Sequence, residues 1–324
     1  MIPETTSYHG QPVIKQPTWT WEIPTYFFTG GMSGASAGVA YLAGLRGNDV
    51  LARRAWTVSL GAIGISPVFL ISDLGKPARF LNMLRMFKVT SPMSVGSWIL
   101  SGSGAATTLA AANAWTGLFP RTARLARPAA ALFGLPLSTY TAALVANTAV
   151  PVWHEARRTL PFVFGSGAGL SAGAMVAVVT PPADAAPARR LAVGAALAEG
   201  VANELMHHRL GEHGEPYKSG TASLFSHISR ACTVSGAALM LRRGASSRAA
   251  AVVAGGLLCA GALAARWSIY KAGFQSTADP KYVVGPQRSL IERGERTGAS
   301  RRTAKVSEAR PEKGSPATAP VELT

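Results

Sequence analysis

The sequence predicts an all-α integral membrane protein with eight transmembrane helices, arranged as two tandem four-helix bundles. Three observations predict this fold class. Hydrophobic residues make up 48% of the 324 residues and charged residues only 15%, well below the roughly 25% usual for soluble domains. Eight stretches are mostly apolar over about the 20 residues that a helix needs to cross a bilayer, and the two halves of the chain resemble each other.

The eight apolar stretches are each bounded by charged residues, proline or both. Alanine and glycine dominate them, so each one taken alone is only weakly apolar and could be a buried helix of a soluble protein. Eight in series, with almost no alternating strand pattern between them, favour membrane spans. We predict spans over residues 25–45, 55–72, 93–115, 128–150, 161–180, 191–206, 224–241 and 249–269.

The spans divide the chain into four regions. Residues 1–24 are polar, contain proline and lack a basic region before the first apolar run, so we expect no secretory signal peptide there. Residues 25–150 form the first four-helix half and residues 151–275 the second. Residues 276–324 are rich in charge, proline, serine and glycine, and we expect a basic, largely disordered tail.

The chain is strongly basic, with 32 Lys and Arg against 16 Asp and Glu. The basic residues form short clusters between the uncharged stretches and are not interleaved with aromatic residues, so we expect contact with lipid and not with nucleic acid. An even number of spans places both termini on one side. The basic loops are nearly balanced between the two sides, and the basic tail favours termini in the cytoplasm of a protein of the inner, cytoplasmic membrane.

Cysteine and histidine limit the redox groups that the chain can hold. Cys232 and Cys259 are far apart, which excludes a disulfide framework, a cysteine-rich zinc site and a four-cysteine iron–sulfur cluster within this chain. We expect no bound metal. A haem held between two histidines stays open as an alternative, and only His207 and His227 are placed to approach each other.

An internal repeat relates the two halves at an offset of 135 residues. Residues 27–38 align with 162–173 at six identical positions, and Gly30, Gly34 and Gly38 recur as a second small-residue ridge. A repeat unit of four spans gives both halves the same orientation. Further along, where the offset is 136 residues, the halves diverge at polar residues, since Asp73 aligns with Arg209. We infer a duplicated scaffold with one functional and one degenerate half.

The most specific pattern in the chain covers residues 73–98. An acidic helix end begins a D-L-G-x-P-x-R-F loop, a basic amphipathic turn follows, and S-P-M-S-x-G-S-W opens the third span. This pattern resembles the polysulfide reductase NrfD family of integral membrane subunits, over roughly residues 19–290. The resemblance implies an eight-helix subunit that binds a quinone, menaquinone or ubiquinone, without a redox metal of its own. It also implies an iron–sulfur, ferredoxin-like partner subunit and, in many complexes, a molybdopterin catalytic subunit.

Quinone chemistry requires an apolar slot, aromatic walls, hydrogen-bonding groups and ionisable groups for two protons. We expect the pocket between the first four helices, at the end where the first span begins. Asp73 is either a solvated helix end or a proton-delivery group, and Arg79 is close enough along the loop to pair with it. The expected catalytic residues are Asp73, Glu22 and Arg79, and the expected quinone contacts are Trp21, Tyr26, Ser94, Trp98, Tyr140 and Asn147.

Ionisable residues also occur inside the predicted spans of the second half. Glu199 and Arg230 lie at similar depths, about 13 and 10 Å from their shared connection at 1.5 Å per residue, so we expect them to pair. The leading hypothesis is a quinone-reactive membrane anchor of an oxidoreductase complex. A secondary transporter, which would predict broken helices, and a haem-bearing cytochrome subunit are the alternatives.

Overall fold

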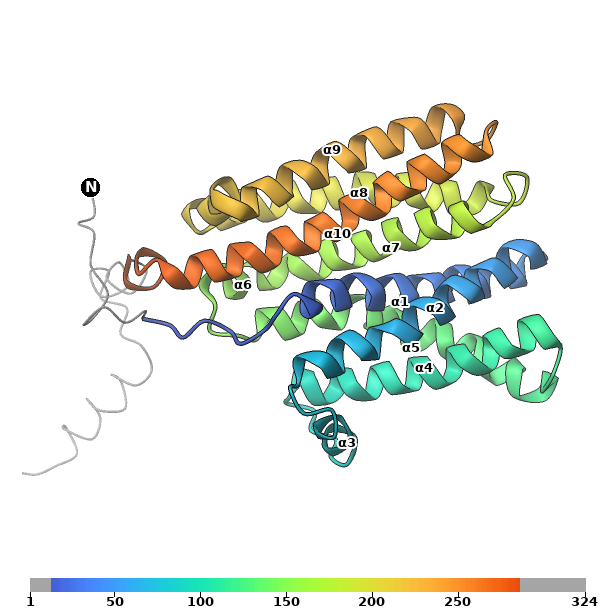
Figure 1. Ribbon diagram of the computed structural model, residues 1–324, viewed down its shortest axis with the longest axis horizontal. Coiled ribbons are helices and arrows are strands. Elements are labelled where there is room, and N and C mark those ends of the chain that lie inside the picture. The colour runs from blue at the N-terminus through green and yellow to red at the C-terminus, as the bar shows by residue number, and fades with distance from the viewer. Residues whose placement is uncertain (1–12, 286–324) are drawn as a thin grey trace, which may run out of the picture.

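The computed structural model describes residues 13–285, and their only regular secondary structure is helical, with no strand among them. Figure 1 shows long helices that lie side by side along one axis, with the described chain beginning and ending at the same end. The predicted all-helical class is therefore confirmed. The eight long helices are α1 (Glu22–Leu45), α2 (Asp49–Asp73), α4 (Pro92–Thr116), α5 (Pro120–Ala146), α7 (Leu160–Val179), α8 (Ala186–Leu210), α9 (Gly220–Arg243) and α10 (Arg248–Ala278).

Four short elements connect the long helices. These are α3 (Arg79–Leu84), α6 (Pro151–Glu155) and two 3₁₀ segments, η2 (Ala156–Arg158) and η3 (Gly211–Lys218). Several long helices start at capping signals that the sequence carries. The side chains of Asn48, Ser91 and Ser247 accept hydrogen bonds from backbone N–H groups in the first turns of α2, α4 and α10, which satisfies donors that have no partner within the helix.

The long helices extend beyond the predicted spans at several ends. α2 begins at Asp49 instead of residue 55, and α5 begins at Pro120 instead of residue 128. The added turns contain arginines, among them Arg53 and Arg127. The predicted spans end at these charges because hydropathy falls there. A helix continues past them because the charged heads of such side chains can reach the polar interface while their stems cover apolar surface.

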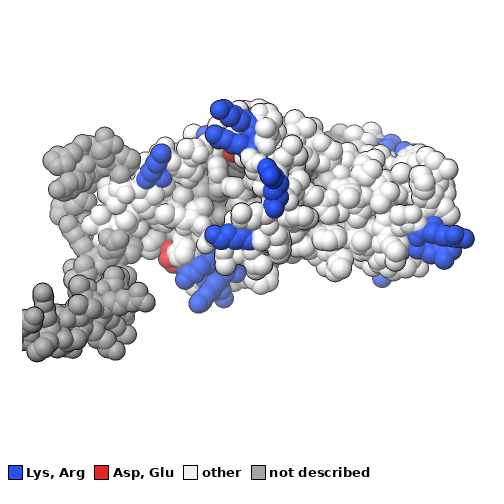
Figure 2. Space-filling view, turned by 90° about the horizontal axis from the view of Figure 1, so that it is seen from below, with Lys and Arg blue, Asp and Glu red and all other residues white. Residues whose placement is uncertain are grey.

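Four helices, α2, α5, α7 and α10, are long and apolar enough to cross a membrane by composition alone. The other long helices, α1, α4, α8 and α9, are similar in length but do not reach that apolarity. Figure 2 shows Lys and Arg gathered in two zones of the visible face, with an uncharged zone between them. The protein is thus a multi-pass helical membrane protein.

Helices α1 and α7, which begin the two halves of the predicted repeat, pack against each other near the centre of the structure. α1 also packs against α2 and α5, and α4 packs against α5 and α2. On the other side, α7 packs against α8 and α10, and α9 lies along α10. α9 contacts α8 much less, which leaves space between these two helices.

Small residues allow the closest helix crossings. A methyl group on Gly34 of α1 would overlap the carbonyl oxygen of Gly134 on α5, and one on Gly173 of α7 would overlap the backbone of α8. A methyl group on Gly38, from the same predicted ridge, would meet no other part of the described chain within 4 Å. Ser33 and Ser59 join α1 to α2 because each hydroxyl donates to the other residue's carbonyl oxygen at 3.0 Å. Such packing and hydrogen bonding hold helices together in lipid, where no hydrophobic force does.

Candidate functional site

Two of the predicted acidic residues meet through one threonine at the end of α2. The backbone N–H and the hydroxyl of Thr20 donate to Asp73 Oδ1 at 3.0 and 2.8 Å, and the same hydroxyl lies within hydrogen-bonding reach of Glu22 Oε2. A hydroxyl has one proton and donates to one carboxylate at a time. Asp73 and Glu22 are both partly exposed, so this carboxylate cluster of Thr20, Glu22 and Asp73 contacts water.

Two predicted tyrosines form a pair one turn further along α1. The Tyr26 side chain is fully buried, and its hydroxyl is hydrogen-bonded to that of Tyr140 on α5. Tyr140 fits here because Gly96 of α4 has no side chain, and a methyl group on Gly96 would overlap the tyrosine ring. Gly96 belongs to the S-P-M-S-x-G-S-W pattern, so the motif glycine makes room for the tyrosine pair.

Arg79 and Trp21 do not join these two clusters. Arg79 is exposed at the start of α3 and forms no ion pair within residues 13–285, so the structure does not form the expected pair with Asp73. Thr20 satisfies the Asp73 carboxylate instead. Trp21 is 56% exposed and packs edge-on against Phe69, which is the position of a tryptophan at a membrane interface.

Ser94 and Trp98 hold the loop before α4. The hydroxyl of Ser94 donates to the carbonyl oxygen of Met86 at 3.0 Å and accepts from the backbone N–H of Lys88 at 3.1 Å. Trp98 is 43% exposed and packs edge-on against Phe87. In this structure both side chains fasten the 85–91 segment to α4, which is a structural role.

Asn147 is exposed at the C-terminal end of α5, two turns beyond Tyr140. Its backbone N–H donates to the carbonyl oxygen of Ala143 at 3.0 Å, and it ends the helix there. The structure therefore brings Glu22 and Asp73 together and, separately, Tyr26 and Tyr140. The five other predicted residues lie around the same end of the helices.

Sequence reasoning missed two groups that shape this end. The first is Thr20, which lies just before the start of α1. Hydroxyl residues at that position commonly bond to nearby groups at the helix end, and this was the available signal. The other is an aromatic group in which the indole of Trp19 stacks on that of Trp153 at 5.5 Å and the hydroxyl of Tyr270 donates to the Trp19 carbonyl oxygen at 2.5 Å. Tyr270 lies on α10, 251 residues from Trp19 along the chain, and no local pattern connects them.

The ion pairs of the second half differ from the sequence prediction. Glu199 was expected to pair with Arg230, and this is wrong: Glu199 pairs with Arg266 of α10 at 3.7 Å, and both side chains are 3% exposed. Arg230 pairs instead with Glu204 at 2.6 Å, in an exposed position. Glu199 is buried and Glu204 is exposed, and each pairs with an arginine in the same environment. An arginine inside the predicted 249–269 span was the missed signal.

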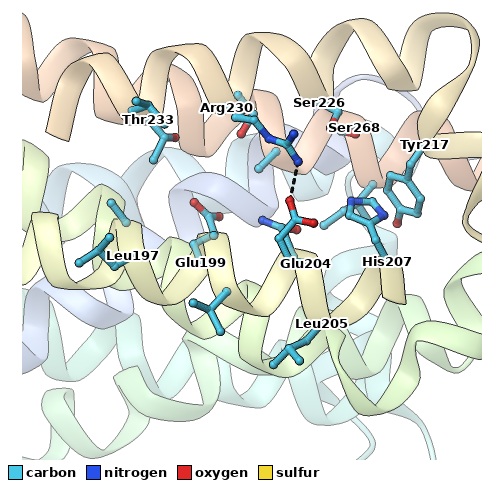
Figure 3. A pocket seen from close by; sticks show the side chains of 18 of the residues that line it. Leu197, Glu199, Glu204, Leu205, His207, Tyr217, Ser226, Arg230, Thr233 and Ser268 are labelled. Carbon is cyan, nitrogen blue, oxygen red and sulfur yellow. Dashed lines mark hydrogen bonds and ion pairs between the residues drawn. The ribbon is translucent and has the colours of Figure 1, made fainter. Parts of the chain in front are cut away.

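The buried pair is enclosed by α7. The guanidinium of Arg266 donates to the carbonyl oxygen of Phe164 at 2.9 Å and lies 4.3 Å from the centre of its ring. Gly167 of α7 borders both charged side chains, and a methyl group there would overlap them. A cavity of about 720 Å³ lies beside Glu199, between α8, α9 and α10 (Figure 3).

The two alternative functions predict features that can be compared with the fold. The long helices run without a break between their bounds, whereas the transporter hypothesis predicts broken helices. Within residues 13–285, no group of three or more His, Cys, Asp and Glu side chains is placed to hold a metal ion. His207, one of the two histidines considered for haem, packs edge-on against the ring of Tyr217 at 4.8 Å.

The fold and this site define a polytopic helical membrane protein with a polar cluster at one end of its first four helices. The family model for polysulphide reductase, NrfD, matches residues 8–191, and the chain belongs to that family. Members of the NrfD family are membrane subunits of oxidoreductase complexes, and the predicted family is confirmed. A comparison with curated proteins finds no significant match.

Proposed function

We propose that this chain is the quinone- or quinol-interacting membrane anchor of an oxidoreductase complex and passes electrons between an iron–sulfur partner subunit and the quinone pool. The observation that carries the proposal is the convergence of the carboxylate cluster and the Tyr26–Tyr140 pair at one end of α1, α2 and α5. Polar and ionisable groups are rare within membrane spans and mark functional sites. Here they lie next to the family motif.

The donor set fits a quinone ring. Two hydrogen-bonded tyrosine hydroxyls have two protons between them, and their mutual bond uses one. The other proton is available to a carbonyl oxygen, and the partly exposed Tyr140 is the residue of the pair nearer the surface. A bound quinone would supply a centre for two electrons and two protons. The carboxylates of Asp73 and Glu22 would hold and exchange protons with water at the membrane edge.

We propose that all eight long helices cross the cytoplasmic membrane as two four-helix bundles, with cytoplasmic termini. The packing of α1, α2, α4 and α5 on one side and of α7 to α10 on the other supports this arrangement. The less apolar helices α1, α4, α8 and α9 are about as long as the four that qualify by composition. In a bundle, helix faces that contact other helices need not be as apolar as faces that contact lipid.

The segment 76–89 is our proposed docking surface for the iron–sulfur subunit. It includes α3, which follows the C-terminal end of α2 (Figure 1), and α2 ends at Asp73. Exposed apolar side chains rimmed by charge are typical of protein interfaces. The segment exposes the apolar residues Leu81, Met86, Phe87 and Val89 beside the basic residues Lys76, Arg79, Arg85 and Lys88. A molybdopterin catalytic subunit would bind through that partner.

The test is Asp73→Asn in the purified complex, which removes a proton acceptor with little change in volume. We expect slower quinone turnover, with unchanged assembly and unchanged reduction of an artificial dye by the partner subunits. Asp49→Asn, at the opposite end of α2, is the matched control and should leave both activities as they are. Unchanged quinone turnover in Asp73→Asn would contradict a proton-transfer role for this residue.

A further inference from the structure

A small cavity lies at the end of the first half that is opposite the carboxylate cluster. It has a volume of about 240 Å³ and is enclosed by the last turns of α1 and α4 and the first turns of α2 and α5. Asp49, which lines it, and Asp73 are at opposite ends of α2, roughly 36 Å apart at 1.5 Å per residue. The volume is below the roughly 300–1,000 Å³ of sites that enclose a whole small molecule, so it suits a head group.

The basic residues at this end of the first half are all arginines. They are Arg46, Arg53, Arg54, Arg121, Arg124 and Arg127, and Asp49 is the acidic residue that lies among them in the sequence. Figure 2 shows Lys and Arg gathered at the right-hand end of the visible face. A guanidinium matches a phosphate through paired N–H donors, which the ammonium of lysine does not offer. The composition of this end therefore favours a phosphate ligand.

Two of these arginines, Arg53 and Arg127, line the cavity, and each is held by a residue of α4. The guanidinium of Arg127 donates to Asn113 Oδ1 at 2.8 Å, and that of Arg53 lies 5.7 Å from the centre of the Trp115 ring. The indole N–H of Trp115 donates to the hydroxyl of Thr57 at 2.8 Å, which fixes the ring against α2. An amide and a ring orient a guanidinium without neutralising its charge, so the two arginines are preorganised for an anion.

The positive charge of the cavity is not cancelled by the chain. Neither Arg53 nor Arg127 forms an ion pair within residues 13–285. Asp49 also lines the cavity, but it lies in the first turn of α2, where the N–H groups of the helix end stabilise a carboxylate. Arg54 lies 5.9 Å from the centre of the same Trp115 ring and adds a third positive charge. An anion is therefore the ligand that complements this site.

The second half shows how the corresponding arginine is used when no ligand is needed. Arg53 aligns with Arg189 at the offset of 136 residues. The guanidinium of Arg189 donates to the carbonyl oxygen of Pro182 at 2.8 Å, so the backbone provides its acceptor. The guanidinium of Arg53 contacts a ring instead, and a ring leaves its N–H donors to an outside acceptor. The two halves thus differ at this position as a binding half and a closed half.

The surroundings of the cavity indicate that a lipid carries the anion. Helices α2 and α5 are apolar enough to cross a membrane and are 25 and 27 residues long, more than the about 20 that span its core. Their ends therefore reach the level of the lipid head groups. Leu45, which lines the cavity, and Leu118 and Phe119 in the turn before α5 are all exposed. Exposed apolar side chains next to arginines complement the acyl chains and the phosphate of one molecule.

We propose that this cavity binds the phosphate of an anionic phospholipid, with Arg53 and Arg127 as the residues that bind it. Asn113 and Trp115 are positioning residues, since they hold the two guanidinium groups in place. The site lies at the other end of α2 from Asp73, so the proposal does not rest on the proposed quinone site.

Native mass spectrometry of the full chain, released from detergent and titrated with lipid, tests this proposal. The probes are phosphatidylglycerol and phosphatidylcholine with the same acyl chains; both contain a phosphate, but the choline group cancels its charge. We expect phosphatidylglycerol to bind at least tenfold more tightly, and ammonium phosphate at the same concentration not to displace it. Equal binding of phosphatidylcholine would overturn the proposal. Displacement by ammonium phosphate would show a site for free phosphate and would overturn it as well.

Two double variants distinguish a site from general attraction to a basic end. Arg53→Gln with Arg127→Gln should weaken phosphatidylglycerol binding by about tenfold for each arginine, the factor for one charge-assisted hydrogen bond. Arg190→Gln with Arg243→Gln removes the same charge from exposed positions at the same end that do not line the cavity, and it should change binding little. Equal weakening by the two double variants would show that no site exists.

Asp49→Asn tests the sign of the charge that the site accepts. It removes the carboxylate that lines the cavity and should strengthen phosphatidylglycerol binding, whereas weaker binding would contradict an anion site. The melting temperature of each variant without lipid should equal that of the native chain, because the substituted side chains are exposed. Asp73→Asn should leave lipid binding unchanged, so this result and that of the quinone test can fail separately.

Discussion

Glu199 on α8 and Arg266 on α10 form an ion pair at 3.7 Å in which both side chains are only 3% exposed. The guanidinium also donates to the carbonyl oxygen of Phe164, so the pair connects three helices of the second half. Removing one partner leaves an uncompensated buried charge, which in proteins costs about 3–5 kcal/mol, whereas replacing both by apolar residues costs much less. This pair is therefore a test of how the second half is held together.

We predict that Arg266→Met lowers the free energy of unfolding by about 3–5 kcal/mol and that the Glu199→Met, Arg266→Met double variant restores most of it. Thermal unfolding in detergent measures both. The exposed pair Glu204–Arg230 is the control, because an exposed pair contributes only about 0–1 kcal/mol. A double variant no more stable than Arg266→Met would contradict this prediction.

Gly96→Ala should displace Tyr140 from its hydrogen bond with Tyr26, because the added methyl group overlaps the tyrosine ring. Overpacking of this kind costs about 1–3 kcal/mol, and we expect quinone turnover to fall as well. On the same helix, a methyl group on Gly104 would meet its nearest neighbour, Ile63 Cγ1, at an ordinary 3.7 Å. Gly104→Ala should therefore be neutral, and equal effects of the two variants would contradict the role of Gly96.

Two glycines of one ridge should respond to alanine in opposite directions. Gly34→Ala places a methyl group against the backbone of Gly134 and should lower the melting temperature. Gly38→Ala meets no atom within 4 Å, and it should raise the melting temperature because alanine is favoured over glycine in a helix by about 1 kcal/mol. Destabilisation by both variants would mean that Gly38 is covered by a partner.

The topology can be measured with a reporter enzyme that is active only outside the cytoplasm. We expect fusions after Lys88 and after Thr324 to be inactive and a fusion after Gly117 to be active, because eight crossings place the first two positions on the cytoplasmic side. Activity in the reverse pattern would reverse the orientation. If the reporter were active at only one of Lys88 and Thr324, the number of crossings between these two positions would not be even.

The ion pair of Glu215 with Lys281 should fasten η3 to the segment after α10 only over a middle range of pH. The hydrogen bond from Lys281 lowers the pKa of Glu215 below its ordinary value of 4.5, and the bond to Glu215 raises the pKa of Lys281 above 10.5. Because the pKa of Glu215 is lowered, its carboxylate stabilises the folded state at pH values above 4.5. This stabilisation is lost as the pH falls through the lowered pKa. Because the pKa of Lys281 is raised, its ammonium group stabilises the folded state at pH values below 10.5. This stabilisation is lost as the pH rises through the raised pKa.

Hydrogen exchange of residues 281–285 measures this attachment. At pH 7 we expect faster exchange in Glu215→Gln than in the native chain. Glu212→Gln, in the same 3₁₀ segment but without an ion pair to any residue of 13–285, should exchange like the native chain. In the native chain, the protection of these amides, corrected for the intrinsic pH dependence of exchange, should fall as the pH drops below 4.5. Unchanged protection over that range would contradict a role of the ion pair in holding this segment.

The sequence by itself determined the helical class, the eight long helices, the family and the acidic end of the second helix. These features are local: hydropathy over about 20 residues, prolines, caps such as Asn48 and the residues 73–98 all act within a few turns of chain. Helix ends were displaced by a turn or two because hydropathy stops at the first charge, whereas backbone hydrogen bonds continue beneath arginines that extend to the interface.

Only the tertiary structure decided which side chains meet across helices. Glu199 pairs with Arg266 and not with Arg230 because Glu199 and Arg266 are buried together against Gly167 of α7, whereas Arg230 is exposed. Tyr140 reaches Tyr26 because Gly96 leaves space for its ring. The cavity beside Glu199 exists because α9 packs along α10 and leaves α8 partly uncovered. Such contacts depend on helix rotation and separation, which hydrophobic pattern and charge alone do not encode in a bundle rich in alanine and glycine.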